Sequence, residues 1–246
     1  MLRRRFLKLA IGMAAMAGAG VGFFKLWEQF GEGVKKELVK EIELPVEEII
    51  ELPEPRRSGK VSVEQAINNR RSRRSYSQEP VLLGEISQLC WAAQGITEKA
   101  YGFRAAPSAG ALYPMEIFLV VGNSDLEPGI YHYRCADHVL ELVKKGDYRE
   151  NLCRAAVGQE WVKNAALNVV ITGIFSRTEA KYGERGRERY VFMEAGHVAE
   201  NIYLQAESLA LATFSVGAFY DEAVREVLSL SEEYTPIYVM PIGHRS

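Results

Sequence analysis

The sequence predicts an α+β fold for residues 61–246. Its strand-like segments occur partly as hairpins between separate helix-like segments, rather than in a regular β-α-β alternation. No G-x-G-x-x-G motif follows a strand-like segment, which disfavours a Rossmann-type dinucleotide fold. The chain has 246 residues, of which 48% are hydrophobic, so it can bury a sizeable core.

The first half of this domain is expected to hold two helices and a buried strand. In VSVEQAINN, residues 61–69, the apolar residues recur at helical spacing. GEISQLCWAAQG repeats the pattern and stops at Gly95, a residue typical of helix C-termini. The run MEIFLVVG, residues 115–122, is continuously apolar apart from one glutamate and predicts a buried strand.

The second half is expected to alternate strands with longer helices. GIYHYRCADHVLELVKKG, residues 129–146, predicts a hairpin that turns near Asp137, and ALNVVITGIF predicts a second central strand. The longest helix is expected from about Glu188 to Leu211, with one face mostly apolar. A strand (ATFSVGAF), a helix (DEAVREVLSL) and a last strand (TPIYVMPIG) follow.

Residues 1–24 predict a targeting segment. RRRFLK, residues 3–8, resembles the twin-arginine export motif and precedes a weakly apolar stretch rich in Ala and Gly. This predicts export by a twin-arginine-type signal to the outside of the cytoplasmic membrane. The protein there is either soluble, after cleavage near AGA at residues 17–19, or held by an uncleaved N-terminal anchor. Residues 25–60 alternate acids, lysines and aliphatics before three prolines, which predicts a helical, proline-containing linker.

Charge and cysteine content exclude several classes of protein. The formal net charge of −2 gives no overall basic field, which argues against nucleic acid as a partner. The three cysteines are widely spaced, and they predict neither a disulfide framework nor a zinc site. His132 and His138 in the predicted hairpin are too isolated to indicate a metal site.

RRSRRSYS, residues 70–77, is a candidate anion site. It places four arginines and three serines directly after the first predicted helix. A guanidinium presents a planar fork of N–H donors to phosphate, and serine hydroxyls add donors at shorter range. A phosphate monoester fits this chemistry. The alternative is a solvated basic helix end, favoured by the helix dipole.

APSAGALYP, residues 106–114, is a candidate ligand loop. Ala109, Gly110 and Ala111 carry little side chain, and two prolines stiffen the segment. The backbone of such a loop can approach a flat ligand closely. The alternative is a tight connection into the strand that follows.

Together, these two stretches resemble the nitroreductase-like flavoprotein family over about residues 63–245. The resemblance implies a nitroreductase-like fold, with a central, mostly antiparallel sheet flanked by helices. It also implies a homodimer with FMN at the subunit interface. The family's R-x-S-x-R element holds the FMN phosphate and ribityl chain. Its P-S-x-G-x-x-x-P loop reaches the flavin from the partner subunit and is matched here by Pro107, Ser108, Gly110 and Pro114.

Two further segments follow in the family order. SVGAF matches a strand whose backbone meets the flavin near N5, and PIGHR matches a last strand that returns a basic residue to the phosphate. The cofactor contacts implied by the resemblance are Arg70, Arg71, Ser72, Arg74, Pro107, Ser108, Ala109, Gly110, Leu112, Val216, Gly217 and Arg245.

KYGERG before the long helix, together with GALYP, resembles the SagB/ThcOx branch of this family. That branch includes azoline oxidases, which use FMN to dehydrogenate thiazoline and oxazoline rings in peptides. The resemblance implies catalytic roles for Lys181 and Tyr182. Removing a hydride from one carbon requires a base for the proton on its neighbour, and a lysine or a tyrosinate can serve. The alternative is that the pair only decorates a surface loop.

The sequence therefore predicts an FMN-dependent oxidoreductase that passes hydride between an organic substrate and flavin N5. A nitro or quinone reductase with NAD(P)H as electron donor is one alternative, and a non-catalytic flavin-binding subunit of a maturation complex is another. The expected partners are a second copy of the chain and a small-molecule or peptide substrate. A membrane quinone or an electron-transfer protein is a candidate electron acceptor.

Other conspicuous residues have plainer interpretations. Glu194 and Glu200 on the long helix are expected to be surface or interface charges, and His197 a semi-buried histidine. Trp161 is expected in the core or at a dimer contact, or as a wall of the substrate pocket. Tyr113 is open to either interpretation, because its loop is expected to border the flavin.

Overall fold

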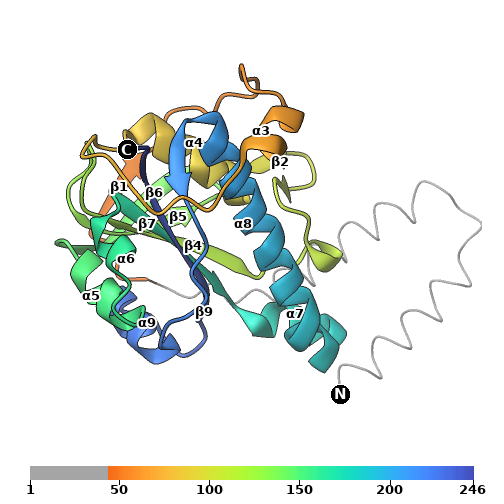
Figure 1. Ribbon diagram of the computed structural model, residues 1–246. Helices are drawn as coiled ribbons and strands as arrows, with labels where there is room; N and C mark the ends of the chain where they lie inside the picture. The colour runs from red at the N-terminus through yellow and green to blue at the C-terminus, as the bar shows by residue number, and fades with distance from the viewer. Residues whose placement is uncertain (1–43) are drawn as a thin grey trace, which may run out of the picture. The chain divides into compact units, whose positions relative to one another are not determined.

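The computed structural model describes residues 44–246, which form a seven-stranded sheet with helices on both faces (Figure 1). The strand order is β1-β6-β5-β4-β7-β9-β8, and all neighbouring strands run antiparallel. The predicted α+β class, with a mostly antiparallel sheet flanked by helices, is confirmed.

The central strands are the apolar runs of the sequence. β4 and β7 are buried along almost their whole length because helices cover both faces of the sheet. The strands of the sheet are β1 (Glu48–Glu51), β4 (Met115–Val121), β5 (Gly129–Arg134), β6 (Val139–Lys145), β7 (Leu167–Gly173), β8 (Leu211–Thr213) and β9 (Thr235–His244). β2 (Ile96–Glu98) and β3 (Phe103–Arg104) form a separate hairpin.

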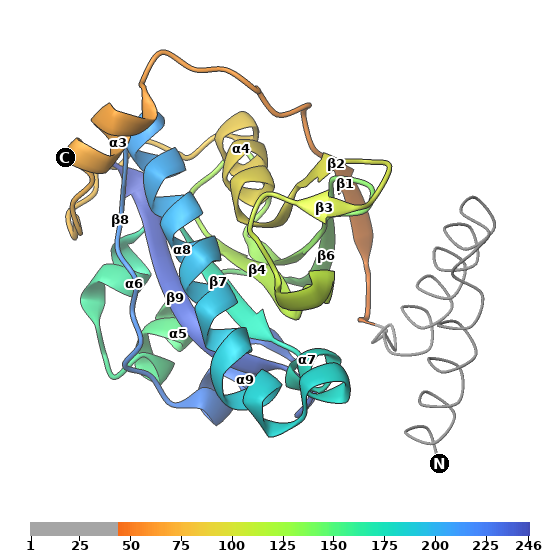
Figure 2. The ribbon, with the colours of Figure 1, turned by 90° about the vertical axis from the view of Figure 1, so that its right-hand side faces the viewer.

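The helices lie in two layers, with α4 and α8 across one face of the sheet and α5, α6 and α9 on the other (Figures 1 and 2). The helices are α3 (Val63–Asn69), α4 (Leu83–Gln94), α5 (Arg149–Ala155), α6 (Glu160–Asn164), α7 (Phe175–Tyr182), α8 (Val191–Ser208) and α9 (Asp221–Leu228). α8 buries Val191, Ala195, Val198 and Ile202 against the sheet, at the spacing of one helix face.

The predicted linker differs from the structure over residues 44–60. Glu48–Glu51 is the edge strand of the main sheet and pairs with β6, and Leu52 is only 8% exposed. Arg56 N donates to Gln88 Oε1 at 2.8 Å, and Gln88 Nε2 donates back to Arg56 O at 3.0 Å. A short edge strand with alternating acids and aliphatics resembles a charged linker in sequence, which explains the error. The predicted leader (1–24) and residues 25–43 lie outside the described part.

Two predicted elements are shorter in the structure. Of ATFSVGAF, residues 212–219, only Ala212 and Thr213 belong to a strand, β8. Val216 returns to the sheet through a bridge in which its N–H donates to Val239 O at 2.8 Å. The long helix begins with a π-helical turn, Gly186–Tyr190, and its α-helical part ends at Ser208.

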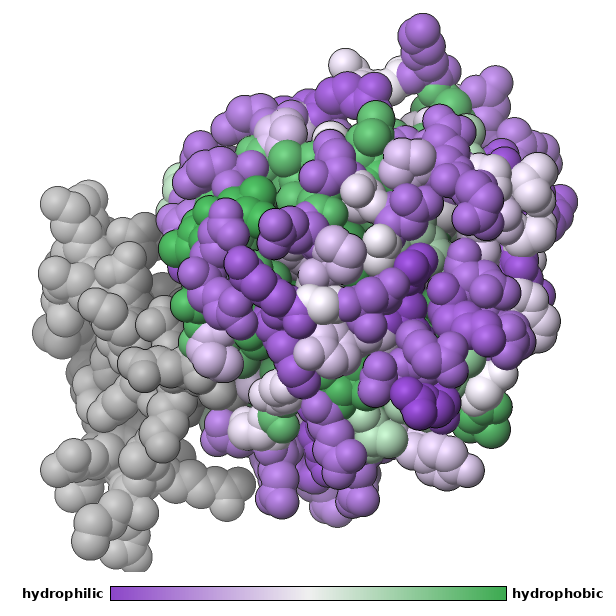
Figure 3. Space-filling model, turned by 90° about the vertical axis from the view of Figure 1, so that its left-hand side faces the viewer, coloured by the Kyte–Doolittle hydropathy of each residue, from purple (hydrophilic) through white to green (hydrophobic). Residues whose placement is uncertain are grey.

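The surface is mostly hydrophilic on the face drawn in Figure 3, where hydrophobic residues gather in one smaller area. Among residues 44–246, no helix combines the length and the apolar character needed to cross a bilayer.

Candidate functional site

The arginine segment, residues 70–77, packs against the C-terminal half of α8. The guanidinium of Arg70 lies over the ring of Tyr203 at 5.2 Å, and Ser72 Oγ is 3.4 Å from Tyr203 Oη. Arg73 N donates to Thr213 O at 3.0 Å, which ties the segment to β8. The segment therefore connects α3 to the sheet edge in a fixed path.

Arg71 and Arg74, both predicted as contacts to FMN, lie in different surroundings. Arg71 is exposed and donates to Asn68 O at 3.0 Å and to Arg70 O at 2.7 Å, as expected of a basic helix end. Arg74 lies over the ring of Phe214 at 4.6 Å. Arg71 thus fits the alternative interpretation of a solvated basic helix end, whereas Arg74 lines a hollow.

That hollow has a volume of about 590 Å³, within the size range of small-molecule sites. It brings Arg74 together with Val216 and Gly217, which are far from it in the sequence. Trp161 is also part of the wall and is 41% exposed, so it does not lie in the core. The lining is Arg74, Gln159, Trp161, Phe214, Ser215, Val216, Gly217 and Ala218.

Arg245 returns to the arginine segment, as the resemblance implied, but its charge is paired. Tyr76 and Arg245 form a β-bridge, and Arg245 Nη2 lies 2.7 Å from Glu207 Oε2. Arg73 Nη2 lies 3.9 Å from the same oxygen. Glu207 therefore acts as an internal counter-ion for two arginines beside the hollow.

Several buried donors in this region have no hydrogen-bond partner within residues 44–246: Arg73 Nε, Tyr76 Oη and Thr213 Oγ1. Buried polar atoms in folded proteins are normally paired. Arg74 and Ser72 in the same segment are exposed, and their donors fit the phosphate and ribityl end of FMN.

The loop at residues 106–114 holds a strained backbone. Gly110, Ala111 and Tyr113 have φ values of 65°, 54° and 47°, a region that costs energy for residues other than glycine. Hydrogen bonds hold this shape. Tyr113 N donates to Ser108 Oγ at 2.9 Å, and Tyr113 Oη accepts from Arg104 N at 3.2 Å. The loop is therefore a preformed element.

Lys181 and Tyr182, in the last turn of α7, meet this loop at Gly110. A Cβ atom placed on Gly110 would lie 2.6 Å from Tyr182 Oη and 2.7 Å from Lys181 Nζ. Lys181 Nζ also lies 5.4 Å from the centre of the Tyr182 ring. The structure thus brings together two motifs that are some 70 residues apart in the sequence.

The segment after Tyr182 supports the position of Lys181 and Tyr182 beside Gly110. α7 ends at Gly183, which has a φ of 63°, and the Tyr182 ring meets the Tyr190 ring edge-on at 5.1 Å. The π-helical turn at Gly186–Tyr190 then leads into α8, and such turns are frequent at functional sites.

The two halves of the candidate site do not meet within the described chain. No hydrogen bond or ion pair in residues 44–246 joins the arginine segment to Lys181 or Tyr182. Thirteen helical positions separate Tyr190, beside Tyr182, from Tyr203, beside Arg70, which corresponds to about 20 Å along α8. One chain therefore presents two partial sites.

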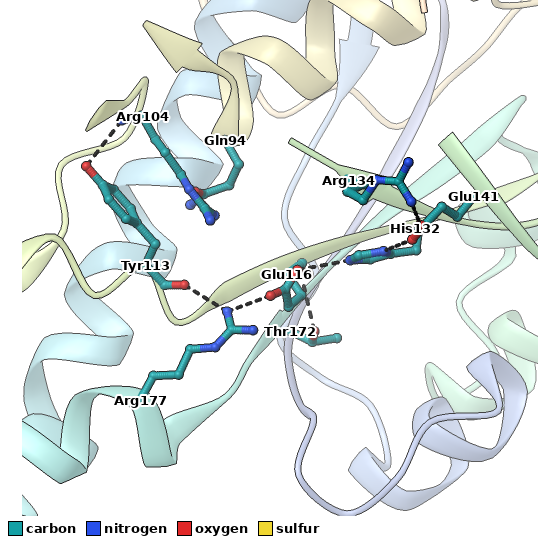
Figure 4. Close-up of polar contacts among 9 residues, drawn as sticks. All are labelled: Gln94, Arg104, Tyr113, Glu116, His132, Arg134, Glu141, Thr172 and Arg177. Atoms are coloured by element: carbon teal, nitrogen blue, oxygen red, sulfur yellow. Dashed lines mark hydrogen bonds and ion pairs between the residues drawn. The ribbon is translucent and has the colours of Figure 1, made fainter. Parts of the chain in front are cut away.

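A row of charged side chains, most of them little exposed, begins at Arg177, which contacts the end of the loop (Figure 4). Arg177 Nη1 lies 2.5 Å from Glu116 Oε1, and Glu116 Oε2 lies 2.9 Å from His132 Nε2. His132 Nδ1 lies 2.8 Å from Glu141 Oε2, and Glu141 also binds Arg134. The five side chains alternate in sign from α7 across β4, β5 and β6.

This row explains two large pKa shifts. Burial opposes charge on His132, but hydrogen bonds to Glu116 and Glu141 outweigh it and raise the pKa of His132 to about 9. Burial likewise opposes charge on Glu116, but His132 and Arg177 lower the pKa of Glu116 to about 2. His132 and Glu116 are therefore both charged at neutral pH.

This row of charges is not predicted from the sequence. His132 is not isolated, because sheet pairing places it between two glutamates. A signal was present in Glu116, the single charged residue of the apolar run MEIFLVVG. Among the described residues, no cluster of three or more His, Cys, Asp or Glu side chains could hold a metal ion.

Glu194 and His197 differ from their predictions. Glu194 is 2% exposed rather than a surface charge, because α8 turns it under the loop. Burial raises its pKa to about 7, although Ser108, Arg104, Gln94 and Arg177 act in the opposite direction. His197 is exposed rather than semi-buried, and its Nδ1 lies 3.3 Å from Pro107 O. Glu200 is exposed, as predicted.

The model of the nitroreductase family matches residues 67–244. The chain belongs to the nitroreductase family. Members of this family bind FMN and use NAD(P)H. The predicted nitroreductase-like fold is thereby confirmed.

Three similar proteins illustrate the range of this family. A candidate nitroreductase of Methanocaldococcus jannaschii is 40% identical over 186 residues, 75% of this chain and 92% of that protein. The microcin B17-processing protein McbC of Escherichia coli is 29% identical over 148 residues, 57% of this chain and 54% of McbC. A crystal structure of a candidate nitroreductase from Ralstonia eutropha has a TM-score of 0.72 at 29% identity, covering 85% of this chain and 97% of that one.

Proposed function

We propose that this chain is an FMN-dependent dehydrogenase of the SagB/ThcOx-like branch of the nitroreductase family. It transfers hydride between an organic substrate and flavin N5. The observation that carries the proposal is the meeting of Lys181 Nζ and Tyr182 Oη at Gly110 of the P-S-x-G loop. The similarity to McbC, a microcin-processing protein, supports the same branch.

The arginine segment and the hollow beside it would hold FMN. Arg70, Ser72 and Arg74 supply donors for the phosphate and the ribityl chain, and the backbone of Val216 and Gly217 faces the ring. When bound, FMN supplies a hydride acceptor at N5. The protein supplies donors, a shaped hollow and residues that move a proton.

Lys181 and Tyr182 carry the proton chemistry. Lys181, acting as the neutral amine, accepts at Nζ a proton from the substrate carbon next to the one that loses hydride, and Tyr182 orients this amine. Both groups are exposed at the end of α7, where a substrate held against the loop can reach them.

Substitution of this pair separates a dehydrogenase from a non-catalytic flavin carrier. We expect Lys181→Ala and Tyr182→Phe to retain bound flavin while turnover falls by about 10²-fold or more. The measurements are flavin absorbance per chain and single-turnover reduction of the flavin. Unchanged turnover in both variants would contradict a catalytic role for the pair.

An NAD(P)H-dependent nitro or quinone reductase is the second candidate, favoured by the 40% identity to the M. jannaschii protein. The purified yellow protein would be mixed with NADH or NADPH without oxygen. Rapid bleaching of the flavin band would favour the reductase. Persistent oxidised flavin would favour a dedicated organic donor.

We also propose that the protein is an exported homodimer. On α8, Phe192 and Met193 are 50% and 54% exposed, which gives a second copy an apolar surface to cover. RRRFLK supports export, with a membrane quinone or an electron-transfer protein as acceptor. Arg3→Lys combined with Arg4→Lys should leave the protein in the cytoplasmic fraction.

A further inference from the structure

We propose that Arg177 is a positioning residue that fixes the Lys181–Tyr182 helix to the P-S-x-G loop. The inference rests on the proposed function of that pair. Arg177 Nη1 donates to Tyr113 O at 3.0 Å and contacts Glu116 Oε1 at 2.5 Å (Figure 4). One guanidinium nitrogen therefore joins α7, the end of the loop and β4.

α7 meets the loop at two points along one helix face. Arg177 and Lys181 are four positions apart, so their side chains lie on the same side of the helix. Arg177 binds the loop at Tyr113, and Lys181 reaches it at Gly110. Ile174 N also donates to Pro114 O at 2.8 Å at the start of α7. A shift at Arg177 would displace Lys181 relative to the loop.

Glu116 makes this anchor rigid. Its carboxylate is held from the other side by His132 at 2.9 Å, and His132 is held in turn by Glu141 at 2.8 Å. These residues belong to β4, β5 and β6, three adjacent strands of the sheet. The contacts of Arg177 with Glu116 and Tyr113 therefore hold the loop and α7 in a fixed position relative to the sheet.

An arginine is required at this position. Arg177 is buried, and a single planar group must face both a carboxylate and a carbonyl oxygen. A lysine ammonium is a compact charge on a stem that ends nearer the backbone. It would fall short of the position of Nη1, the atom that makes both contacts, so we expect the contacts to Tyr113 O and to Glu116 both to weaken.

Arg149 offers a matched control. It also joins a carboxylate to a backbone carbonyl, with Nη2 at 2.7 Å from Asp147 Oδ2 and Nη1 at 2.7 Å from Ala165 O. It is the first residue of α5, on the opposite face of the sheet from α8. Arg149→Lys therefore reproduces the chemical change without touching the candidate site.

The first test is amide hydrogen exchange on the full chain, which requires no turnover. We expect Arg177→Lys to speed exchange in two segments together, residues 105–114 and 175–182. Arg149→Lys should leave both segments unchanged. If Arg177→Lys leaves either segment at the wild-type rate, the inference is overturned.

The second test is kinetic and uses the FMN-loaded protein. A misplacement of about 1 Å can lower turnover by about 10²-fold, so Arg177→Lys should lower kcat while KM and flavin content stay near wild type. Arg177→Ala should regain turnover when ethylguanidinium is added. A wild-type kcat for Arg177→Lys, or no rescue of a folded Arg177→Ala, would overturn the inference.

The two proposals fail in different ways. A protein that does not bind FMN contradicts the proposed function, while the exchange experiment still tests the link between α7 and the loop. If the wild-type protein binds FMN and is active, and the Arg177→Lys variant shows wild-type amide exchange and wild-type turnover, only the role of Arg177 is contradicted.

Discussion

At the scale of single residues, Gly110 is the point where the P-S-x-G loop meets the proposed catalytic pair, Lys181 and Tyr182. Its φ of 65° and the closeness of Lys181 and Tyr182 each disfavour a side chain. The first effect is local strain, and the second is steric exclusion by the proposed proton-transfer groups. A matched pair of substitutions can separate them.

Gly110→Ala should lower turnover by more than any loss of folding stability can explain. The new methyl group would displace Lys181 Nζ and Tyr182 Oη, whose distances from it would otherwise be below 3 Å. We expect a loss of about 10²-fold in kcat. The control is Gly102→Ala, which has the same φ of 65° but no neighbour within 4 Å. Equal kcat losses in both variants would assign the effect to backbone strain alone.

Glu194 should make stability depend on pH. Its pKa rises from 4.5 to about 7 on folding, so the folded state binds the proton more tightly than the unfolded state. Stability is therefore lost as pH rises from about 4.5 to 7, by about 3 kcal/mol in total.

Glu194→Gln should remove this dependence. The amide stays neutral, so we expect the variant to exceed wild type in free energy of unfolding at pH 8 by up to about 3 kcal/mol. At pH 4.5 the two should be similar. Urea unfolding at both pH values measures this. The same difference between variant and wild type at both pH values would refute the assignment.

At the scale of elements, the edge strand β1 belongs to the domain. β1 pairs with β6 residue by residue, and the residue after it, Leu52, is buried. The strand covers an edge that would otherwise present unpaired backbone groups. Its stability contribution can be measured without shortening the chain.

Leu52→Ala should destabilise the full-length protein by about 2 kcal/mol or more, because it empties a buried position. Ile49→Ala on the same segment is the control, because Ile49 is 51% exposed, and we expect a change below about 0.5 kcal/mol. Urea midpoints for the two variants check this. A similar, small loss for both would mean that residues 44–60 act as a linker after all.

At the scale of the whole molecule, the arginine segment and the Lys181–Tyr182 pair are two partial sites. They contact α8 about 20 Å apart. In a two-fold dimer, the arginine segment of one copy and the loop of the other could complete one flavin site. This arrangement has a consequence that activity measurements can detect.

Mixed dimers should regain activity that both parent variants lack. Arg74→Ala damages the proposed phosphate grip, and Lys181→Ala damages the proton-transfer group. If each site uses one group from each copy, co-expression gives mixed dimers with one intact site. Random pairing then restores about a quarter of wild-type activity. No recovery, with dimers present, would place both groups in one chain's site.

The sequence alone determined the features that depend on neighbours in the chain. The apolar runs of β4 and β7, the helix at α4 and the motifs at residues 70–77 and 106–114 follow from local composition and spacing. These patterns were sufficient to predict the fold class and the family.

Only the tertiary structure decided how these pieces meet. Sheet pairing places His132 between Glu116 and Glu141, packing buries Glu194, and the course of α7 brings Lys181 to Gly110. Each of these is a contact between residues of different elements. Burial raises the pKa of Glu194, whereas hydrogen bonds to Glu116 and Glu141 outweigh burial at His132. Local patterns cannot encode such contacts, because they arise only when the separate elements pack together.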